Sequence, residues 1–190
     1  ANHAAFNLIF RFVENYVSPI AGRISSQRHV MAIRDGFISA MPFMIVGSFL
    51  LVFAYPPFSP DTTWGFARAW LDMAKQFEGQ ILTPFDMTMG IMSIYICAAI
   101  AYNLGKHYVK SHQLDPFMCA MLSLMAFLLV AAPKTKGTLP VDSLGGTGIF
   151  TAILVAIYCV EMMRFLKAHN IGIRLPDQVP PMIKNSFDLL

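Results

Sequence analysis

Charged residues are scarce in this chain. Only 13% of its 190 residues are Asp, Glu, Lys or Arg, which is about half the share in an average soluble domain. Hydrophobic residues make up 56%, and a soluble domain of this size has too little interior to hide them. The formal net charge of +3 is also too small to indicate nucleic acid as a partner. The composition therefore predicts that lipid surrounds much of the chain.

Catalytic and metal-binding patterns are also missing. The sequence has no GxSxG, HExxH or GxGxxG motif and no P-loop. Its three cysteines lie in apolar runs without CxxC spacing, so we interpret them as packing residues: Cys97, Cys119 and Cys159. Its five histidines are scattered, and we interpret them as solvated loop residues: His3, His29, His107, His112 and His169. We expect no catalytic residue, no metal site and no cofactor.

The sequence contains four long intervals without Asp, Glu, Lys or Arg, of 25, 19, 18 and 18 residues. About 20 residues of α-helix cross a hydrocarbon core ~30 Å thick, because each residue adds ~1.5 Å. The intervals predict an all-α integral membrane fold with four transmembrane helices, near residues 36–56, 87–105, 115–133 and 146–165. Neighbouring ionisable residues such as Asp86 and Glu161 fall at predicted span ends. An ionisable residue at the bilayer middle would indicate a functional site, and none is predicted in this chain.

Two further segments have amphipathic helical patterns. In the arm of residues 1–28, polar side chains occupy one narrow arc, which predicts a helix lying in the membrane interface and ended by Pro19 and Gly22. Packing of this helix inside the bundle is the alternative. Residues 64–78 contain both tryptophans of the chain, Trp64 and Trp70. Because indole prefers the headgroup level, we expect this segment to form an interfacial cap over the first hairpin.

The distribution of Lys and Arg predicts the orientation. Ten of these residues fall on one side of the predicted spans and four on the other. The positive-inside rule therefore places both termini in the cytoplasm.

Small residues recur on two of the predicted spans. Gly36, Ala40 and Gly47 lie on the first, and Ala101 and Gly105 show small-xxx-small spacing on the second. Such stripes let helices approach closely in lipid, so they predict a helix bundle or a dimer face.

The tail, residues 170–190, is predicted to be an extended cytoplasmic loop because its dense prolines exclude a continuous helix. Its motif consists of Leu175, Pro176, Asp177, Val179 and Pro180. The final Ser-Phe-Asp-Leu-Leu reads as the start of a further apolar element. We therefore expect the chain to be an incomplete part of a larger permease.

Three stretches resemble the enzyme IIC membrane subunit of the bacterial phosphotransferase system, in its lactose/cellobiose/chitobiose family. HVMAIRDGFISAMP at 29–42 is similar to the first span of the family. The Gly-Ile-Met-Ser at 90–93 is similar to its second span, and LPDQVPP at 175–181 followed by Ser186 and Phe187 resembles its proline-rich loop. The resemblance covers essentially the whole chain and is most specific in the loop.

The resemblance implies the N-terminal half of a sugar permease in the bacterial cytoplasmic membrane. Such a permease carries a beta-linked disaccharide of the cellobiose, chitobiose or lactose type, which a separate IIB subunit phosphorylates. Family members are homodimers about twice this length, and their N-terminal helices mainly build the dimer scaffold. Their sugar-contacting residues lie in the C-terminal half, so no substrate-binding residue is assigned in this chain.

Two other classes of protein remain as alternatives. A self-contained small helical channel or ion-coupled carrier would need a polar pathway formed by these 190 residues. The absence of predicted mid-membrane charge speaks against that class. A membrane-embedded enzyme would need a nucleophile or a metal cluster, and the sequence offers no pattern for either.

Overall fold

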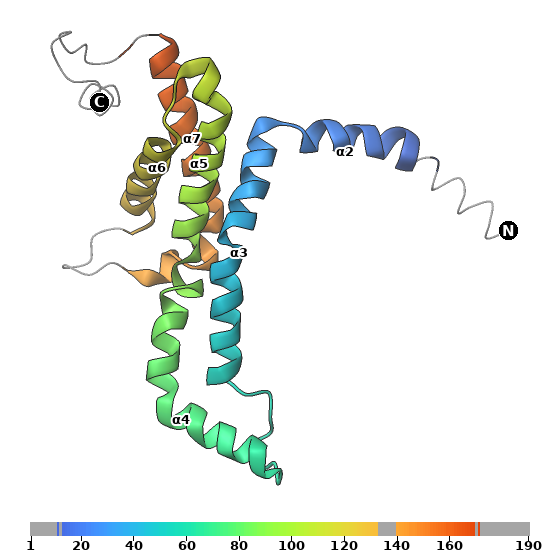
Figure 1. The fold of residues 1–190 in the computed structure, drawn as a ribbon, viewed down its shortest axis with the longest axis vertical. Coiled ribbons are helices and arrows are strands. Elements are labelled where there is room, and N and C mark those ends of the chain that lie inside the picture. Colours follow the sequence, from blue (N-terminus) through green and yellow to red (C-terminus); the bar gives the residue numbers. More distant parts are fainter. Residues whose placement is uncertain (1–10, 12, 133–139, 170, 172–190) are drawn as a thin grey trace.

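Helices account for all the regular secondary structure that the computed structural model describes, namely residues 11, 13–132, 140–169 and 171 (Figure 1). The predicted all-α class is confirmed for these residues. Three stretches are long and apolar enough to cross a membrane: Arg28–Ala54, Gly65–His112 and Gly146–Ala168. The predicted span 115–133 corresponds to a helix of only 16 residues, Pro116–Ala131. That is shorter than the ~20 residues that a crossing needs.

Helix α3 is the longest single helix, with 27 residues from Arg28 to Ala54. At ~1.5 Å per residue it is about 40 Å long. It contains most of the first predicted span, and its buried residues are small: Ala32, Gly36, Ala40, Gly47 and Ala54. Large apolar side chains such as Phe49 and Val52 point outward and are exposed. Small residues on one face and large ones on the other allow α3 to pack closely on one side only.

Helices α4 and α5 form one long interrupted helix. Helix α4 runs over Gly65–Asp86, a 3₁₀ turn, η2, over Met89–Ile91, and α5 over Met92–His112. Figure 1 shows α4 crossing the end of α3 and then turning back alongside it. The predicted cap at 64–78 is therefore only the first part of α4. The helix continues beyond residue 78 to Asp86, and α4 packs against α3.

Helix α5 is the centre of the bundle and packs against α3, α6 and α7. Helix α6 is Pro116–Ala131, and its cap is Asp115, whose side chain accepts a hydrogen bond from Phe117 N. Helix α7 is Ile149–Ala168, preceded by two 3₁₀ turns, η3 at Val141–Ser143 and η4 at Gly146–Gly148. Side chains of α5 dominate the core, including Ile96, Ile100, Leu104 and Tyr108.

The two ends of this bundle differ in the segments that meet there. The terminal end is where α3 and α6 begin and where α5 and α7 end, at the top of Figure 1. The hairpin end is the opposite one, where residues 55–64 connect α3 to α4.

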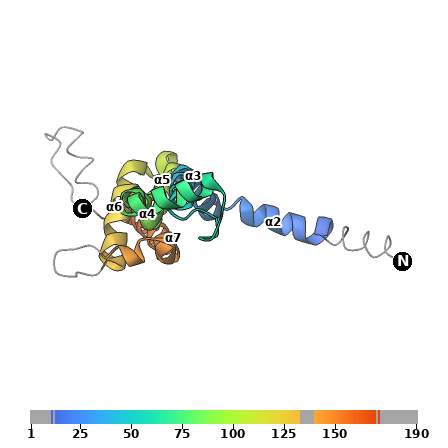
Figure 2. The same cartoon turned by 90° about the horizontal axis from the view of Figure 1, so that it is seen from below.

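The N-terminal arm differs from its predicted form. A short π-helix, η1, at Val13–Val17 continues into α2 at Ser18–Ser25, so Pro19 and Gly22 do not end the helix. Pro19 lies in the first turn of α2, directly after the π-helical turn. No residue of α2 is buried, and α2 projects away from the other helices in two views (Figures 1 and 2). Helix α2 is thus not packed inside the bundle.

Candidate functional site

The first group of candidate residues lies where α3 crosses α5. A Cβ atom added to Gly36 would lie 2.9 Å from the backbone nitrogen of Ile100 and 3.0 Å from its Cα. Ala40 and Ala101 are also buried. The two backbones therefore approach so closely at Gly36 that only a residue without a side chain fits.

Gly47 and Gly105 make similar contacts elsewhere in the chain. A Cβ on Gly47 would meet the side chains of Thr88 and Met89, beside η2. A Cβ on Gly105 would lie 3.1 Å from both Pro116 Cα and Cys119 Sγ, at the start of α6. The structure thus places these predicted packing residues at contacts between helices of one chain.

A polar cluster joins three helices near the terminal end. Glu161 of α7 accepts a hydrogen bond from the hydroxyl of Tyr108 on α5 at 2.5 Å. The same oxygen, Oε1, lies 2.9 Å from His29 Nε2 on α3. The other carboxylate oxygen pairs with Arg164 Nε at 2.9 Å. A single carboxylate therefore links α3, α5 and α7.

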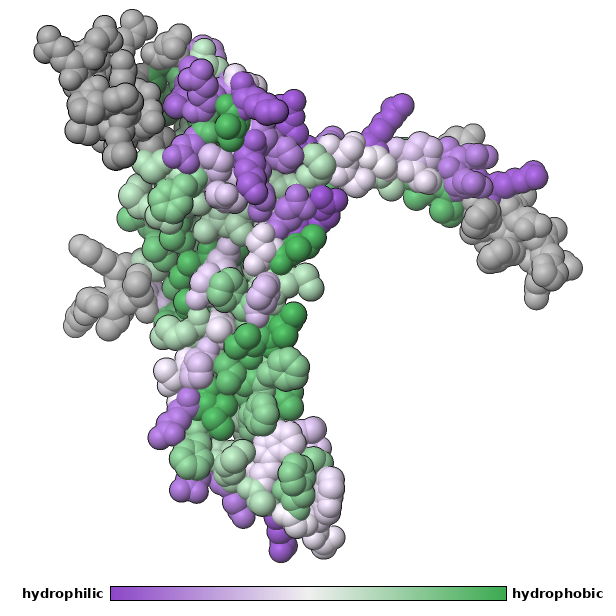
Figure 3. Space-filling model, viewed as in Figure 1, coloured by the Kyte–Doolittle hydropathy of each residue, from purple (hydrophilic) through white to green (hydrophobic). Residues whose placement is uncertain are grey.

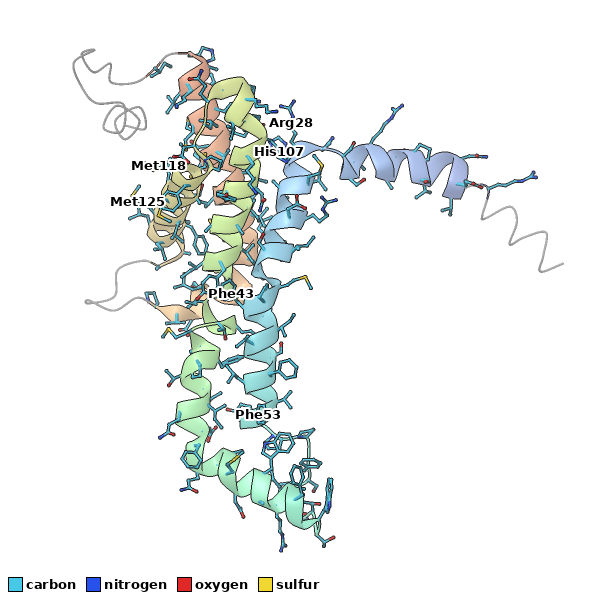
Figure 4. All side chains as sticks on the ribbon, viewed as in Figure 1. Arg28, Phe43, Phe53, His107, Met118 and Met125 are labelled. Atoms are coloured by element: carbon cyan, nitrogen blue, oxygen red, sulfur yellow. The ribbon has the colours of Figure 1, made fainter. Side chains whose placement is uncertain are left out.

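Two guanidinium groups lie over the ring of Tyr108 in this cluster. The Arg28 group is 5.7 Å and the Arg164 group 5.1 Å from the ring centroid, which is within cation–π range. Figure 4 shows Arg28 and His107 at the same end of the bundle. The interpretation of His29 as a solvated loop residue is wrong, because it lies in the first turn of α3 and contacts Glu161. His107 and His112 also belong to a helix, α5.

The interruption between α4 and α5 contains irregular backbone and polar side chains. The backbone N–H and the hydroxyl of Ser93 both donate to Leu144 O, which fastens η3 and η4 to the start of α5. The hydroxyl of Tyr95 donates to Met87 O at 2.7 Å. A Cβ on Gly145 would lie 3.1 Å from Gly90 O, so backbone lies directly against backbone.

This interruption lies beside the middle of α3. Phe43 of α3 stacks on Tyr95 with ring centroids 4.3 Å apart, whereas Phe53 lies near the hairpin end (Figure 4). Asp86, predicted at the end of a separate span, is therefore at the end of α4 but part-way along α3. The sequence did not reveal the position of Asp86 beside α3, because that position depends on tertiary contacts between α4 and α3.

An aromatic cap closes the hairpin end. Its members are Phe53, Phe58, Trp64, Phe66 and Trp70, with neighbouring ring centroids 5.5–6.0 Å apart. Trp70 Nε1 donates to Phe53 O at 3.2 Å, and Tyr55 donates to Glu78 at 3.1 Å. Trp64 and Phe66 remain more than half exposed. Such a cluster of half-exposed rings is typical of a membrane–water boundary.

Within the described residues, no group of three or more His, Cys, Asp or Glu side chains could hold a metal ion. Cys97, Cys119 and Cys159 are buried, and none of them forms a disulfide. The loop motif at Leu175, Pro176, Asp177, Val179 and Pro180 lies outside the described residues.

The chain has clear relatives. Residues 34–190 match the family described as "Phosphotransferase system, EIIC". The chain is 35% identical to the PTS system cellobiose-specific EIIC component of Geobacillus stearothermophilus, an alignment that covers 93% of this chain and 40% of that protein. It is 34% identical to the lichenan permease IIC component of Bacillus subtilis (strain 168), covering 95% and 41%.

A solved structure shares the fold. It is the crystal structure of the transporter ChbC, the IIC component from the N,N'-diacetylchitobiose-specific phosphotransferase system. The TM-score is 0.76 at 34% sequence identity, and the match covers 94% of this chain and 42% of that one. The chain thus spans about two fifths of the length of these relatives. Sequence and fold agree over nearly all of its residues, and the chain belongs to the phosphotransferase system EIIC family.

Proposed function

We propose that this chain is the N-terminal scaffold part of a permease that carries a beta-linked disaccharide for phosphorylation by a IIB subunit. The observation that carries the proposal is the shared fold with the chitobiose IIC component over 94% of the chain. The names of the relatives give the substrate class, since they include cellobiose-specific and lactose-specific components. The lactose-specific relatives are named EIICB components, which favours a IIB partner.

The proposed position in the membrane follows from two amphipathic helices. Helix α2 projects sideways from the terminal end, and its hydrophobic residues show mainly on its lower side in Figure 3. The first part of α4 carries the aromatic cap at the other end. The ~40 Å of α3 between them equals a bilayer with its headgroups, which is about 40–45 Å thick. By the positive-inside rule, the excess of Lys and Arg on its side supports a cytoplasmic position for the terminal end.

The outer face of α3 is proposed as the homodimer contact. A shallow apolar groove of about 310 Å³ runs along it, lined by Met41, Met44, Ile45, Ser48, Phe49 and Val52. Four of its side chains are large and about half exposed, unlike the small residues on the inner face: Met41, Ile45, Phe49 and Val52. A second copy of α3 would cover this groove with matching apolar surface.

Sugar uptake by the full-length permease tests the proposal. Cells that lack endogenous permeases of this class should accumulate phosphorylated cellobiose, chitobiose or lactose only when both the permease and its IIB subunit are produced. The control is the same strain without the IIB subunit, which should accumulate no sugar phosphate. Accumulation of unphosphorylated sugar without IIB would instead favour the channel or carrier alternative.

Tryptophan fluorescence tests the position of the aromatic cap. The only tryptophans are Trp64 and Trp70, so all indole emission reports on this cap. In lipid vesicles we expect blue-shifted emission that is quenched more by lipids brominated near the ester groups than near the chain ends. Trp64→Phe and Trp70→Phe separate the two signals. Emission typical of water, with no quenching by either lipid, would contradict an interfacial position.

A further inference from the structure

A single extended residue separates the N-terminal arm from the bundle. Helix α2 ends at Ser25, and α3 begins at Arg28. Between them, Gln27 has extended backbone, with φ −69° and ψ 138°, whereas Ser26 still has helical torsions. The backbone N–H of Gln27 donates to Ile24 O at 3.1 Å, which closes the last turn of α2. The direction of the arm is therefore set at Gln27 and in the first turn of α3.

Neither side of this bend is held in the usual way. No residue of α2 is buried, so packing of its own side chains does not fix the arm. The side chain of Gln27 makes no capping hydrogen bond to α3. The first backbone N–H groups of a helix have no partner within the helix, and an uncapped first turn frays easily. If the first turn of α3 frayed, several residues would bend instead of one, and the arm could take many directions.

The first two residues of α3 contact two other helices directly after the bend. The guanidinium of Arg28 lies 5.7 Å from the ring centroid of Tyr108 on α5, and Figure 4 shows Arg28 at the corner between α2 and α3. His29 Nε2 lies 2.9 Å from Glu161 Oε1 on α7. The Tyr108 hydroxyl donates to the same oxygen, and Arg164 pairs with the other, so the Glu161 carboxylate is itself held in place. The first turn of α3 is thus fastened on two sides.

We propose that these five side chains form a latch that confines the bend to Gln27 and so restricts the direction of the arm. The latch consists of Arg28, His29, Tyr108, Glu161 and Arg164. It takes the place of the missing cap, because it holds the first turn of α3 through side chains instead of through a backbone N–H. It also couples the arm to α7: a movement of α7 away from α3 breaks the contact between His29 and Glu161 and loosens the bend. All of these contacts lie within this chain, so the latch does not rest on the proposed sugar or on the proposed dimer.

Distances between spin labels in the full-length permease test the latch. Labels at Ile20→Cys on α2 and Lys110→Cys near the end of α5 form the arm pair, which reports the direction of the arm. Labels at Ser39→Cys on α3 and Lys110→Cys form the bundle pair, which reports whether α3 stays against α5. Both pairs are introduced into a variant without native cysteines and are measured by pulsed electron paramagnetic resonance in lipid nanodiscs.

Arg28→Ala/His29→Ala removes the latch from the α3 side and leaves the contacts between α5 and α7 in place. We expect the distance distribution of the arm pair to become roughly twice as wide or wider, because the first turn of α3 frays. Glu161→Ala changes no residue of α3 or of the arm, yet it should widen the same distribution, because His29 loses its partner. The distribution of the bundle pair should stay the same in both variants.

Arg23→Ala/Arg34→Ala is the matched control, because it removes two arginines near the bend that lie outside the latch. Arg23 is exposed on α2, and Arg34 pairs with Asp35 of its own helix. Both distributions should stay unchanged in this control. An arm distribution that is already broad before substitution, or that stays narrow in Arg28→Ala/His29→Ala, would overturn the latch. Equal widening in the control would also overturn it and indicate that attraction of arginines to lipid headgroups fixes the arm. No widening in Glu161→Ala would overturn the coupling to α7, and a changed bundle pair would overturn a role confined to the bend.

Discussion

Gly36→Val should strongly destabilise the helix bundle, because it adds a branched side chain where α3 and α5 touch. Even the first added carbon would lie 2.9 Å from a backbone nitrogen of α5, and valine adds two more. Backbone cannot rotate away as a side chain does, so α3 and α5 must separate along their length. We expect a loss at or above the upper end of the ~1–3 kcal/mol typical of overpacking. The midpoint of denaturation of the purified protein in detergent measures it.

A matched pair of alanine variants provides the control. Gly79 lies in α4, and a Cβ added there meets nothing within 4 Å. Gly79→Ala should therefore stabilise by about 0.5–1 kcal/mol through helix propensity, whereas Gly36→Ala should destabilise. Because Ile100 Cγ1 is also in the way, Ile100→Ala should partly rescue Gly36→Ala. Stabilisation by both substitutions would show that α3 and α5 are not in contact at Gly36.

Glu161→Gln should also weaken the bundle, by less than Gly36→Val. The carboxylate contacts His29 of α3, Tyr108 of α5 and Arg164 of its own helix, so one substitution weakens the polar contacts from α7 to both α3 and α5. Its side chain is 25% exposed, which puts the expected loss between the ~0–1 kcal/mol of surface pairs and the ~3–5 kcal/mol of buried ones. We expect about 1–3 kcal/mol in the same denaturation measurement.

The exposed ion pair of Arg34 and Asp35 provides the comparison. Their side chains are 61% and 37% exposed and pair with each other within one turn of α3, so Asp35→Asn should change stability by less than about 1 kcal/mol. A double-mutant cycle of Glu161→Gln with Tyr108→Phe should show coupling, because the two side chains share a hydrogen bond. Equal effects of Glu161→Gln and Asp35→Asn would show that the cluster does not join the helices.

Hydropathy alone predicted a helical membrane protein, because each long apolar run is contained in one contiguous stretch of the sequence. The uncharged interval after Asp35 corresponds to most of α3, and the interval before Glu161 to most of α7. Small residues at Gly36 and Gly105 indicated close packing, and the structure shows which neighbour each one meets. The resemblance to the EIIC family, which rested on short motifs, is confirmed by the matches over residues 34–190.

Features that depend on distant residues were not predicted. His29 and Glu161 are 132 positions apart, and nothing in either local sequence indicates the other. Residues 79–86 fall between the predicted cap at 64–78 and the predicted span at 87–105, and the sequence predicted no element there. In the structure these residues are helical, because Pro84 falls within a helix supported along one side by α3. The position of Asp86 therefore follows from helix packing and not from hydropathy.

The outward course of α2 divides the chain into regions that tolerate mutation differently. Because no residue of α2 is buried, exchanges among Ile, Leu, Val and Met at Ile20 or Ile24 preserve its character. In α2, only the polarity of the two sides of the helix has to be kept. At Gly36 or Gly148, by contrast, atoms of the chain already occupy the space of any new side chain, so even a methyl group destabilises the bundle. We therefore expect related sequences to vary in the arm and to keep glycine at the crowded positions Gly36 and Gly148.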